Sequence, residues 1–150
     1  MAQDGFVVEI TQAEDFRFTV HFTQGDLMTD EPPPTGTGSG PQAAELLAAA
    51  VANCLMASLL FFLNKSHAPT GPLRARAQGR TGRDASGRSR ITGIDVTLIA
   101  PGATPRCLSL FENYCTVTQS VRVGIPIKVA VIDEQGRVIH EDHPPSPNPS

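Results

Sequence analysis

The sequence lacks the motifs that define several common functional classes. Its three cysteines contain no CxxC pair, which disfavours a zinc site or a thioredoxin-type redox motif. It has no serine-nucleophile motif, phosphate-binding glycine loop or Rossmann fingerprint, because its glycine-rich stretch at 36–40 follows prolines and lacks a strand–turn–helix context. The cysteines are therefore the first residues to consider for chemistry.

Charge gives no general reason to expect nucleic acid or a membrane as a partner, since the formal net charge is only -3. Half of the twelve basic residues gather on one predicted hairpin, yet no aromatic residue lies between Leu73 and Ile99 to stack on bases. We therefore expect a solvated hairpin face, and the alternative that one of these arginines reaches a neighbouring active site stays open. The six residues are Arg74, Arg76, Arg80, Arg83, Arg88 and Arg90.

A chain of 150 residues with 40% hydrophobic residues has the size of one compact domain. We expect this domain to span residues 1–142 and the proline-rich segment 143–150 to be a disordered tail. No basic, apolar leader stands at the N-terminus, and free cysteines persist in a reducing compartment, so we expect a cytoplasmic location. No cofactor is expected.

The N-terminal third predicts strands at 6–10, 16–22 and 26–29. In the second of these, Phe16, Phe18, Val20 and Phe22 alternate with polar residues, which indicates a sheet with one buried face. The segment 31–40 is rich in proline and glycine and predicts a loop that leads into a helix, with Pro41 suited to its first position.

A long apolar helix is predicted from Gln42 to Lys65. Its run from Leu46 to Leu63 approaches the length that a bilayer requires, but Asn53 and Ser58 interrupt it and the flanks lack clustered Lys or Arg. We therefore expect a buried central helix rather than a membrane span. A ridge of small residues, Ala44, Ala48 and Ala52, allows another element to approach closely.

The rest of the chain predicts strands at 73–83 and 89–100, joined by a turn at 84–87. A helical region at 104–123, broken near Tyr114 and Cys115, precedes a last strand at 125–133. The overall pattern favours an α+β fold. The short cluster His140-Glu141-Asp142-His143 has metal-ligand residue types but adjoins the proline-rich tail, so no metal site is expected.

Two cysteines stand in contrasting surroundings. Cys54 lies within the apolar helix, where a cysteine is either a small core residue with a raised pKa or a reactive thiol. Cys115 lies at a predicted helix start, whose dipole lowers a thiol pKa. A peroxide-attacking thiolate needs a nearby cation and a second thiol that captures the sulfenic acid, which Cys115 can supply if the two residues lie close together. Cys107 is interpreted as incidental.

These residues resemble the OsmC/Ohr family of osmotically inducible and organic hydroperoxide resistance proteins. The matching features are the run Glu-Leu-Leu-Ala-Ala-Ala-x-Ala-x-Cys that ends at Cys54, the helix opened by Cys115, and the order of strands and helices between 6 and 133. The segment Tyr-Cys-x-Val-x-x-Ser is most similar to the OsmC-like branch. The resemblance implies an intertwined α+β homodimer with antiparallel sheets around two long central helices and an active site at the subunit interface. It implies that Cys54 is peroxidatic and Cys115 resolving.

The chain departs from the peroxidase pattern at one position. In those family members a glutamate ten residues before the reactive cysteine orients an activating arginine, whereas this chain has Ala44 there and Glu45 one residue later. Nine helical residues turn by about 180° and ten by about 280°, so Glu45 faces differently, and a role at the helix N-terminus is an equal alternative. Arg17 is the activating candidate by elimination, with a solvated strand residue as the alternative.

The leading hypothesis is a thiol peroxidase acting on organic hydroperoxides, which its apolar surroundings favour, with an external dithiol as reductant and Cys54, Cys115, Arg17 and Glu45 as site residues. The competing hypothesis is a non-catalytic OsmC-like dimer that binds a small apolar ligand at its interface. We expect a homodimer in both cases, because one chain offers little surface to cover a helix that is apolar on every side.

Overall fold

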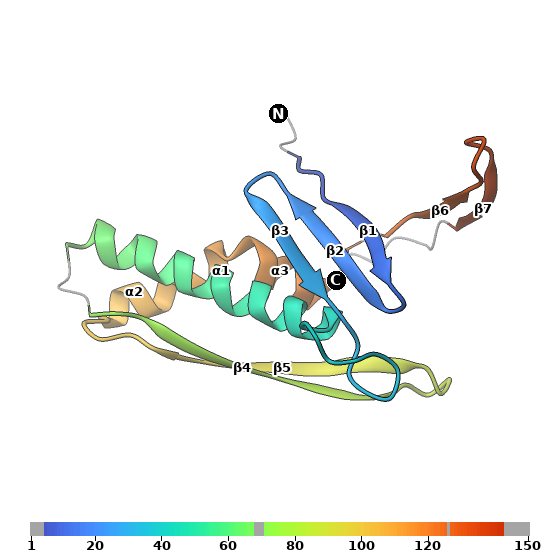
Figure 1. Cartoon of the computed structure of the whole chain (residues 1–150). Helices are drawn as coiled ribbons and strands as arrows, with labels where there is room; N and C mark the ends of the chain where they lie inside the picture. Colours follow the sequence, from blue (N-terminus) through green and yellow to red (C-terminus); the bar gives the residue numbers. More distant parts are fainter. Residues whose placement is uncertain (1–4, 68–70, 126, 143–150) are drawn as a thin grey trace. The chain divides into compact units, whose positions relative to one another are not determined.

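The computed structural model describes residues 5–67, 71–125 and 127–142, which form antiparallel sheets and helices (Figure 1). The predicted α+β class is confirmed. The chain divides into two compact units. The first contains the chain up to Ala52 together with Arg76–Thr97, and the second contains Asn53–Ala75 together with the chain from Leu98 onward.

A three-stranded antiparallel sheet in the order β1-β2-β3 belongs to the first unit, and its strands are Glu9–Glu14, Arg17–Phe22 and Gly25–Thr29. The predicted strand at 6–10 is wrong at its start, since Phe6 is 93% exposed and pairing begins at Glu9. The tight connection at Asp15, whose φ is 51°, sets the register and brings Glu9 opposite His21. Strand length is therefore fixed by the partner strand rather than by the apolar pattern.

The apolar face of this sheet is only partly covered in a single chain. Val20 is buried, whereas Phe18 and Phe22 on the same strand and Phe16 in the turn before it are between 37% and 47% exposed. The alternation predicted one buried face, and the structure buries only one of its four members. A single chain thus leaves aromatic surface in water, which is unusual for a strand that reads as half-buried.

The loop between β3 and the next helix is organised around the carboxylate of Asp30, which is 3% exposed. It accepts hydrogen bonds from the backbone N–H groups of Glu31, Thr37 and Ser39 and from the Thr37 hydroxyl, at 2.6–3.2 Å. Gly36 is required here, because a Cβ at that position would lie 2.3 Å from the carbonyl oxygen of Glu31. These bonds lower the pKa of Asp30 to about 2.

Helix α1 extends over Ala43–Lys65, as its apolar run predicted. It begins just after Gln42, so Pro41 precedes the helix rather than opening it. The Gln42 N–H donates to the Glu45 carboxylate at 3.3 Å, and the Glu45 N–H donates to the Gln42 carbonyl at 3.0 Å. Glu45 thus satisfies an otherwise unpaired group at the helix start, in the manner of a capping box.

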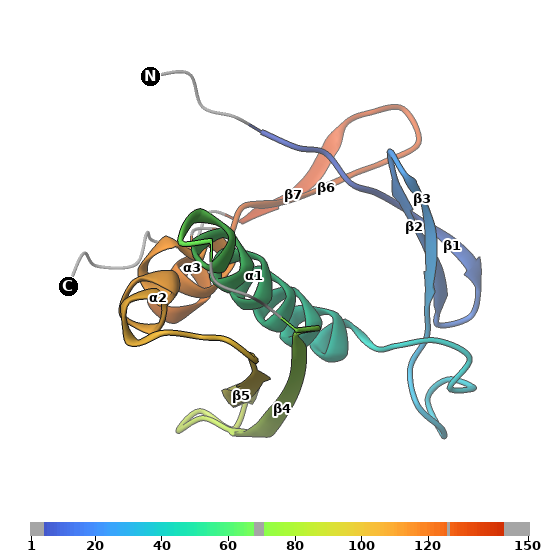
Figure 2. The same cartoon turned by 90° about the vertical axis from the view of Figure 1, so that its left-hand side faces the viewer.

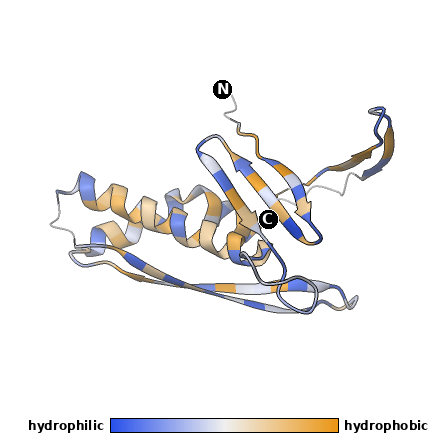
Figure 3. Cartoon of the chain, viewed as in Figure 1, coloured by the Kyte–Doolittle hydropathy of each residue, from blue (hydrophilic) through white to orange (hydrophobic). Residues whose placement is uncertain are grey.

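Only one stripe of α1 is well buried within a single chain, although the helix is apolar on most sides (Figure 3). One chain leaves part of this helix uncovered, as the sequence led us to expect: Leu60 is 40% and Phe61 is 60% exposed. Among the described residues α1 is long and apolar enough to cross a membrane by length and composition alone, a test that core helices of globular proteins also pass. The buried stripe consists of Val51, Leu55, Leu59 and Leu63.

Two hairpins have turns with the same pattern of hydrogen bonds. Strands β4 (Arg74–Arg83) and β5 (Ser89–Ile99) are joined at Asp84, and strands β6 (Val129–Ile132) and β7 (Val138–Asp142) are joined at Asp133. Each aspartate accepts from two backbone N–H groups and from an arginine side chain, and each is followed three residues later by a glycine with φ near 80°. The turn at 84–87 was predicted, whereas the single last strand at 125–133 was wrong, because β7 follows it.

In the second unit, two short helices and a 3-10 turn lie along α1 (Figure 2). These are α2 (Pro105–Leu110), η1 (Phe111–Tyr114) and α3 (Thr116–Val123), and their breaks match the predicted interruption near Tyr114 and Cys115. The Ser58 hydroxyl of α1 donates to the Phe111 carbonyl at 2.6 Å. Cys107, Phe111 and Cys115 are buried, as are Leu55 and Leu59 of α1 in this unit.

Candidate functional site: a pair of thiols

The two cysteines singled out by the sequence meet in the second unit. Cys54 is half-buried on α1, and Cys115 is fully buried at the start of α3. The Cys54 thiol interacts with that of Cys115, and both cysteines are free in this structure. The packing of α3 against α1 thus brings together two residues that are 61 positions apart in the sequence.

Cys115 is the residue that caps α3. Its backbone is extended, and its carbonyl accepts the first helical hydrogen bond, from the Gln119 N–H at 3.0 Å. Its thiol donates to the buried Thr118 hydroxyl oxygen at 2.9 Å. Because a thiol has one proton, the Cys115 thiol is not also free to donate to Cys54.

The N-terminus of α3 is directed at the Cys54 sulfur. The backbone N–H groups of Thr116 and Val117 interact with it, and both lower the Cys54 pKa, as expected for unpaired N–H groups at a helix start. These groups favour the anionic form of the sulfur.

Opposing effects nevertheless prevail, and the pKa of Cys54 is raised. Burial is the largest cause, and the hydrogen bond to Cys115 and the charge of that neighbour add to it. The Cys115 thiol, whose proton is donated to Thr118, does not stabilise the Cys54 thiolate. No arginine is among the groups that dominate this pKa.

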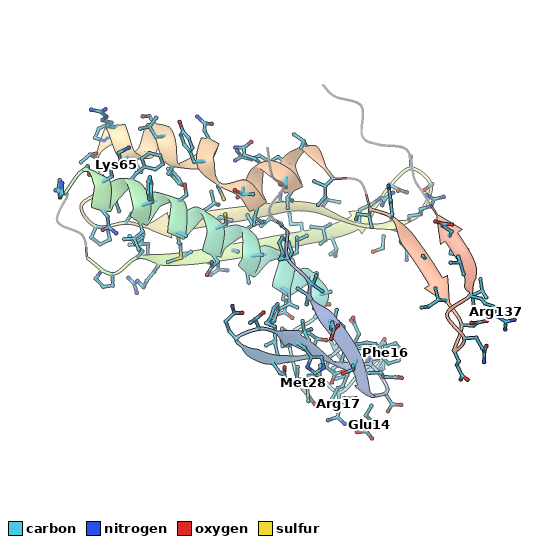
Figure 4. All side chains as sticks on the ribbon, turned by 90° about the horizontal axis from the view of Figure 1, so that it is seen from above. Glu14, Phe16, Arg17, Met28, Lys65 and Arg137 are labelled. Carbon is cyan, nitrogen blue, oxygen red and sulfur yellow. The ribbon has the colours of Figure 1, made fainter. Side chains whose placement is uncertain are left out.

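Arg17 and Glu45, the other predicted site residues, belong to the first unit and have local partners there. Arg17 on β2 pairs with Glu14 across the β1–β2 connection (Figure 4). Glu45 caps α1, which is the alternative that the sequence left equally open. Their predicted roles toward Cys54 remain predictions.

Sequence reasoning missed the backbone N–H groups of Thr116 and Val117 and the hydroxyl of Thr118. Any helix start exposes N–H groups, so the predicted helix start at Cys115 was the available signal for them. Among the described residues no group of three or more His, Cys, Asp or Glu side chains could hold a metal ion. His140 and Glu141 lie on β7, whereas His143 is outside the described residues.

The structure is thus that of an α+β protein with two neighbouring cysteines, one on a long helix and the other at the start of a short helix. A family model described as OsmC-like protein matches residues 36–130, which is more than half of the chain. The chain therefore belongs to the OsmC-like family. No curated protein matches it by sequence.

Solved structures of this family share the fold. An OsmC-like protein of unknown function from Vibrio cholerae is 15% identical over 79% of this chain and 94% of its own, with a TM-score of 0.67. An OsmC-like protein from Mycoplasma pneumoniae is 15% identical over 81% and 89%, with a TM-score of 0.68. An organic hydroperoxide resistance protein from Elizabethkingia anophelis is 18% identical over 81% and 91%, with a TM-score of 0.60.

Proposed function

We propose that this chain is a thiol peroxidase that reduces organic hydroperoxides. The observation that carries the proposal is the interacting pair of Cys54, which is half-buried, and Cys115, which is fully buried. This asymmetry suits a first thiol that meets substrate and a second that meets only the first. Structural neighbours named organic hydroperoxide resistance proteins support the same reaction class.

The reaction has three balanced steps. The Cys54 thiolate attacks one oxygen of a hydroperoxide, the O–O bond breaks, and Cys54 becomes a sulfenic acid while an alcohol leaves. The Cys115 thiol attacks the sulfenic sulfur, forming a Cys54–Cys115 disulfide and releasing water. An external dithiol then reduces this disulfide and is itself oxidised.

The single chain supplies only part of the stabilisation that the thiolate needs. The N–H groups of Thr116 and Val117 favour the anion, but burial outweighs them. We therefore propose that the active form is a homodimer in the cytoplasm and that an arginine completes the site there, with Arg17 as the candidate and Glu45 as its orienting partner. The proposal includes a dimer because the Cys54 thiolate needs a nearby cation that would come with assembly.

The test is turnover of an alkyl hydroperoxide with a dithiol reductant. We expect activity in the wild type, none with Cys54→Ser, and with Cys115→Ser a single turnover that ends in an accumulated sulfenic acid. Cys107→Ser serves as the matched cysteine control and should remain active. A wild-type rate no higher than that of Cys54→Ser would overturn the proposal.

A second function is favoured by one observation, the raised pKa of Cys54. A protonated thiol is a poor nucleophile, so the same fold would serve as a non-catalytic protein that binds a small apolar ligand at a dimer interface. A thiol titration separates the two functions. A Cys54 pKa at or above the free-thiol value of about 8.5 in the assembled protein supports ligand binding, and a value clearly below it supports the peroxidase.

A further inference from the structure

The third cysteine, Cys107, lines a pocket of its own. It is 3% exposed and lies on α2, where α2 packs against the C-terminal end of α1. The pocket measures about 270 Å³ and is large enough for a small organic molecule. Its lining consists of Phe62, Lys65, Ser66, Arg106, Cys107 and Leu110, all of which belong to the second unit.

Hydroxyl groups surround the Cys107 sulfur. The Thr104 hydroxyl donates to it at 3.3 Å, and the Ser66 hydroxyl oxygen lies 3.5 Å away. Ser66 also donates to the Leu63 carbonyl at 2.9 Å, so its proton can turn to the sulfur when the thiol ionises. The hydroxyl bonds, and then the charge of Arg106, lower the pKa of Cys107. The more reactive anionic form is thereby favoured.

The rim of the pocket carries unpaired positive charge. Lys65, labelled at the end of α1 in Figure 4, and Arg106 are both exposed, and neither forms an ion pair with any residue that the structure describes. Phe62 and Leu110 supply apolar surface beside them. A pocket that combines a thiol, two cationic side chains and apolar surface suits a small thiol compound that carries carboxylates.

We propose that this pocket is a second redox site, at which Cys107 forms a mixed disulfide with a carboxylate-bearing low-molecular-weight thiol. The thiol arrives as its symmetrical disulfide. The Cys107 thiolate attacks one of its sulfurs, the S–S bond breaks, and the other half leaves as a thiolate that takes up a proton. Lys65 and Arg106 bind the carboxylates of the retained half.

This site is separate from the Cys54 pair. Cys54 and Lys65, which lines the Cys107 pocket, are eleven residues apart along α1, which corresponds to about 16 Å at the helical rise. A mixed disulfide at Cys107 therefore does not need Cys115 for its formation. The proposal does not rest on peroxidase activity.

The experiment uses the full chain with Cys54→Ser and Cys115→Ser, so that Cys107 is the only thiol. The probes are oxidised glutathione, which is anionic, and cystamine, a cationic disulfide of similar reactivity. Each rate of mixed-disulfide formation, followed by intact mass, is divided by the rate for the same protein unfolded in urea. We expect one adduct per chain and a normalised preference for oxidised glutathione, with no adduct when Cys107→Ser is added.

Charge variants test the role of the rim. Lys65→Gln and Arg106→Gln should each slow the reaction with oxidised glutathione by about 2- to 5-fold, as expected for exposed charge pairs, and should not slow that with cystamine. Arg122→Gln, another exposed arginine of the same unit, is the matched control. The proposal is overturned if the folded protein forms no adduct, if both probes react at equal normalised rates, or if the rim variants change neither rate. Peroxidase turnover of Cys107→Ser is measured in parallel, so that the two proposals can fail independently.

Discussion

Cys54 and Cys115 interact, and Thr118 determines what the Cys115 thiol can donate to. The Thr118 hydroxyl accepts the only proton of the Cys115 thiol. The Cys115 thiol is therefore not free to donate to a Cys54 thiolate. The buried Thr118 hydroxyl, one position beyond the two N–H groups that lower the Cys54 pKa, thus withholds a third donor from Cys54.

Thr118→Val should lower the Cys54 pKa, because it frees the Cys115 thiol to donate to the Cys54 thiolate. A hydrogen bond to a charged group accounts for about 1.5–3 kcal/mol in full, and partial gain of one should speed alkylation of Cys54 at neutral pH by about 2- to 10-fold. The measurement is the pH dependence of iodoacetamide labelling in a Cys107→Ser background. Thr116→Val, an exposed change on the same helix, is the control and should leave the profile unaltered.

Asp30 gives the first unit a defined sensitivity to acid. Its pKa falls from the ordinary value of 3.8 to about 2 in the folded chain, so folding favours the ionised form. The resulting stabilisation is fully present above pH 3.8 and is lost as the pH falls through about 2. The loop at 31–40 should loosen in the same interval, because its N–H groups lose an anionic acceptor.

Asp30→Asn should therefore reduce the free energy of unfolding at pH 7, and the difference from wild type should shrink toward pH 2. Urea unfolding at both pH values measures it. Glu31→Gln, which removes the neighbouring carboxylate instead, should cause a smaller change. A difference for Asp30→Asn that is the same at both pH values would contradict the role assigned to this carboxylate.

Individual elements show where sequence patterns suffice. The helix at 43–65 follows from its uninterrupted apolar run, and the break at Cys115 follows from the change of pattern there. The apolar pattern did not indicate which stripe of α1 is buried, because nearly every position qualifies and the neighbouring elements make the choice. Likewise, the contact between Cys54 and Cys115 depends on how α3 packs, and no local signal encodes it.

A pattern in the sequence could have predicted strand β7. Asp133-Glu134-Gln135-Gly136-Arg137 repeats the aspartate, glycine and arginine spacing of Asp84-Ala85-Ser86-Gly87-Arg88, which was correctly interpreted as a hairpin turn. In both turns the aspartate accepts backbone N–H groups and the glycine adopts a left-handed φ. Comparison of the two segments would have placed a strand after residue 137.

Leu59→Ala should reduce the free energy of unfolding by about 2–5 kcal/mol, because Leu59 is 1% exposed within the buried stripe of α1. Leu60→Ala is the matched control on the next residue, which is 40% exposed. It should reduce the free energy of unfolding of a monomer by less than Leu59→Ala does. Denaturant unfolding monitored by far-UV circular dichroism measures both. Equal losses for the two variants would contradict the burial assigned to this helix.

Considered as a whole molecule, one chain leaves much apolar surface in water. The exposed side of α1 includes Phe61, and the sheet exposes Phe16 and Phe22. Such surface on a folded protein marks a contact with another molecule. Ala52, one member of the predicted small-residue ridge, is already buried in the single chain, so a partner would meet other parts of α1.

We expect the protein to sediment as a dimer at micromolar concentration. Phe61→Glu should convert it to a monomer, because a charge would be buried in the contact, and Asn64→Glu, an exposed position nearly one turn further along α1, should not. Analytical ultracentrifugation decides the matter. A stable, folded monomer of 15.9 kDa for the wild type would rule out both the dimer and an interface active site.

The position of the two thiols also determines how the chain is connected when they are joined. A bond between Cys54 and Cys115 would close a covalent ring that contains β4, β5, α2 and η1, with the sheet β1–β3 on one branch and the hairpin β6–β7 on the other. Because ring closure restricts the unfolded chain, the oxidised form would be the one that resists unfolding, by about 4 kcal/mol for a ring of this size. A dithiol that reduces this bond would therefore lower the free energy of unfolding, and the reduced form would be the one that unfolds and is degraded more readily.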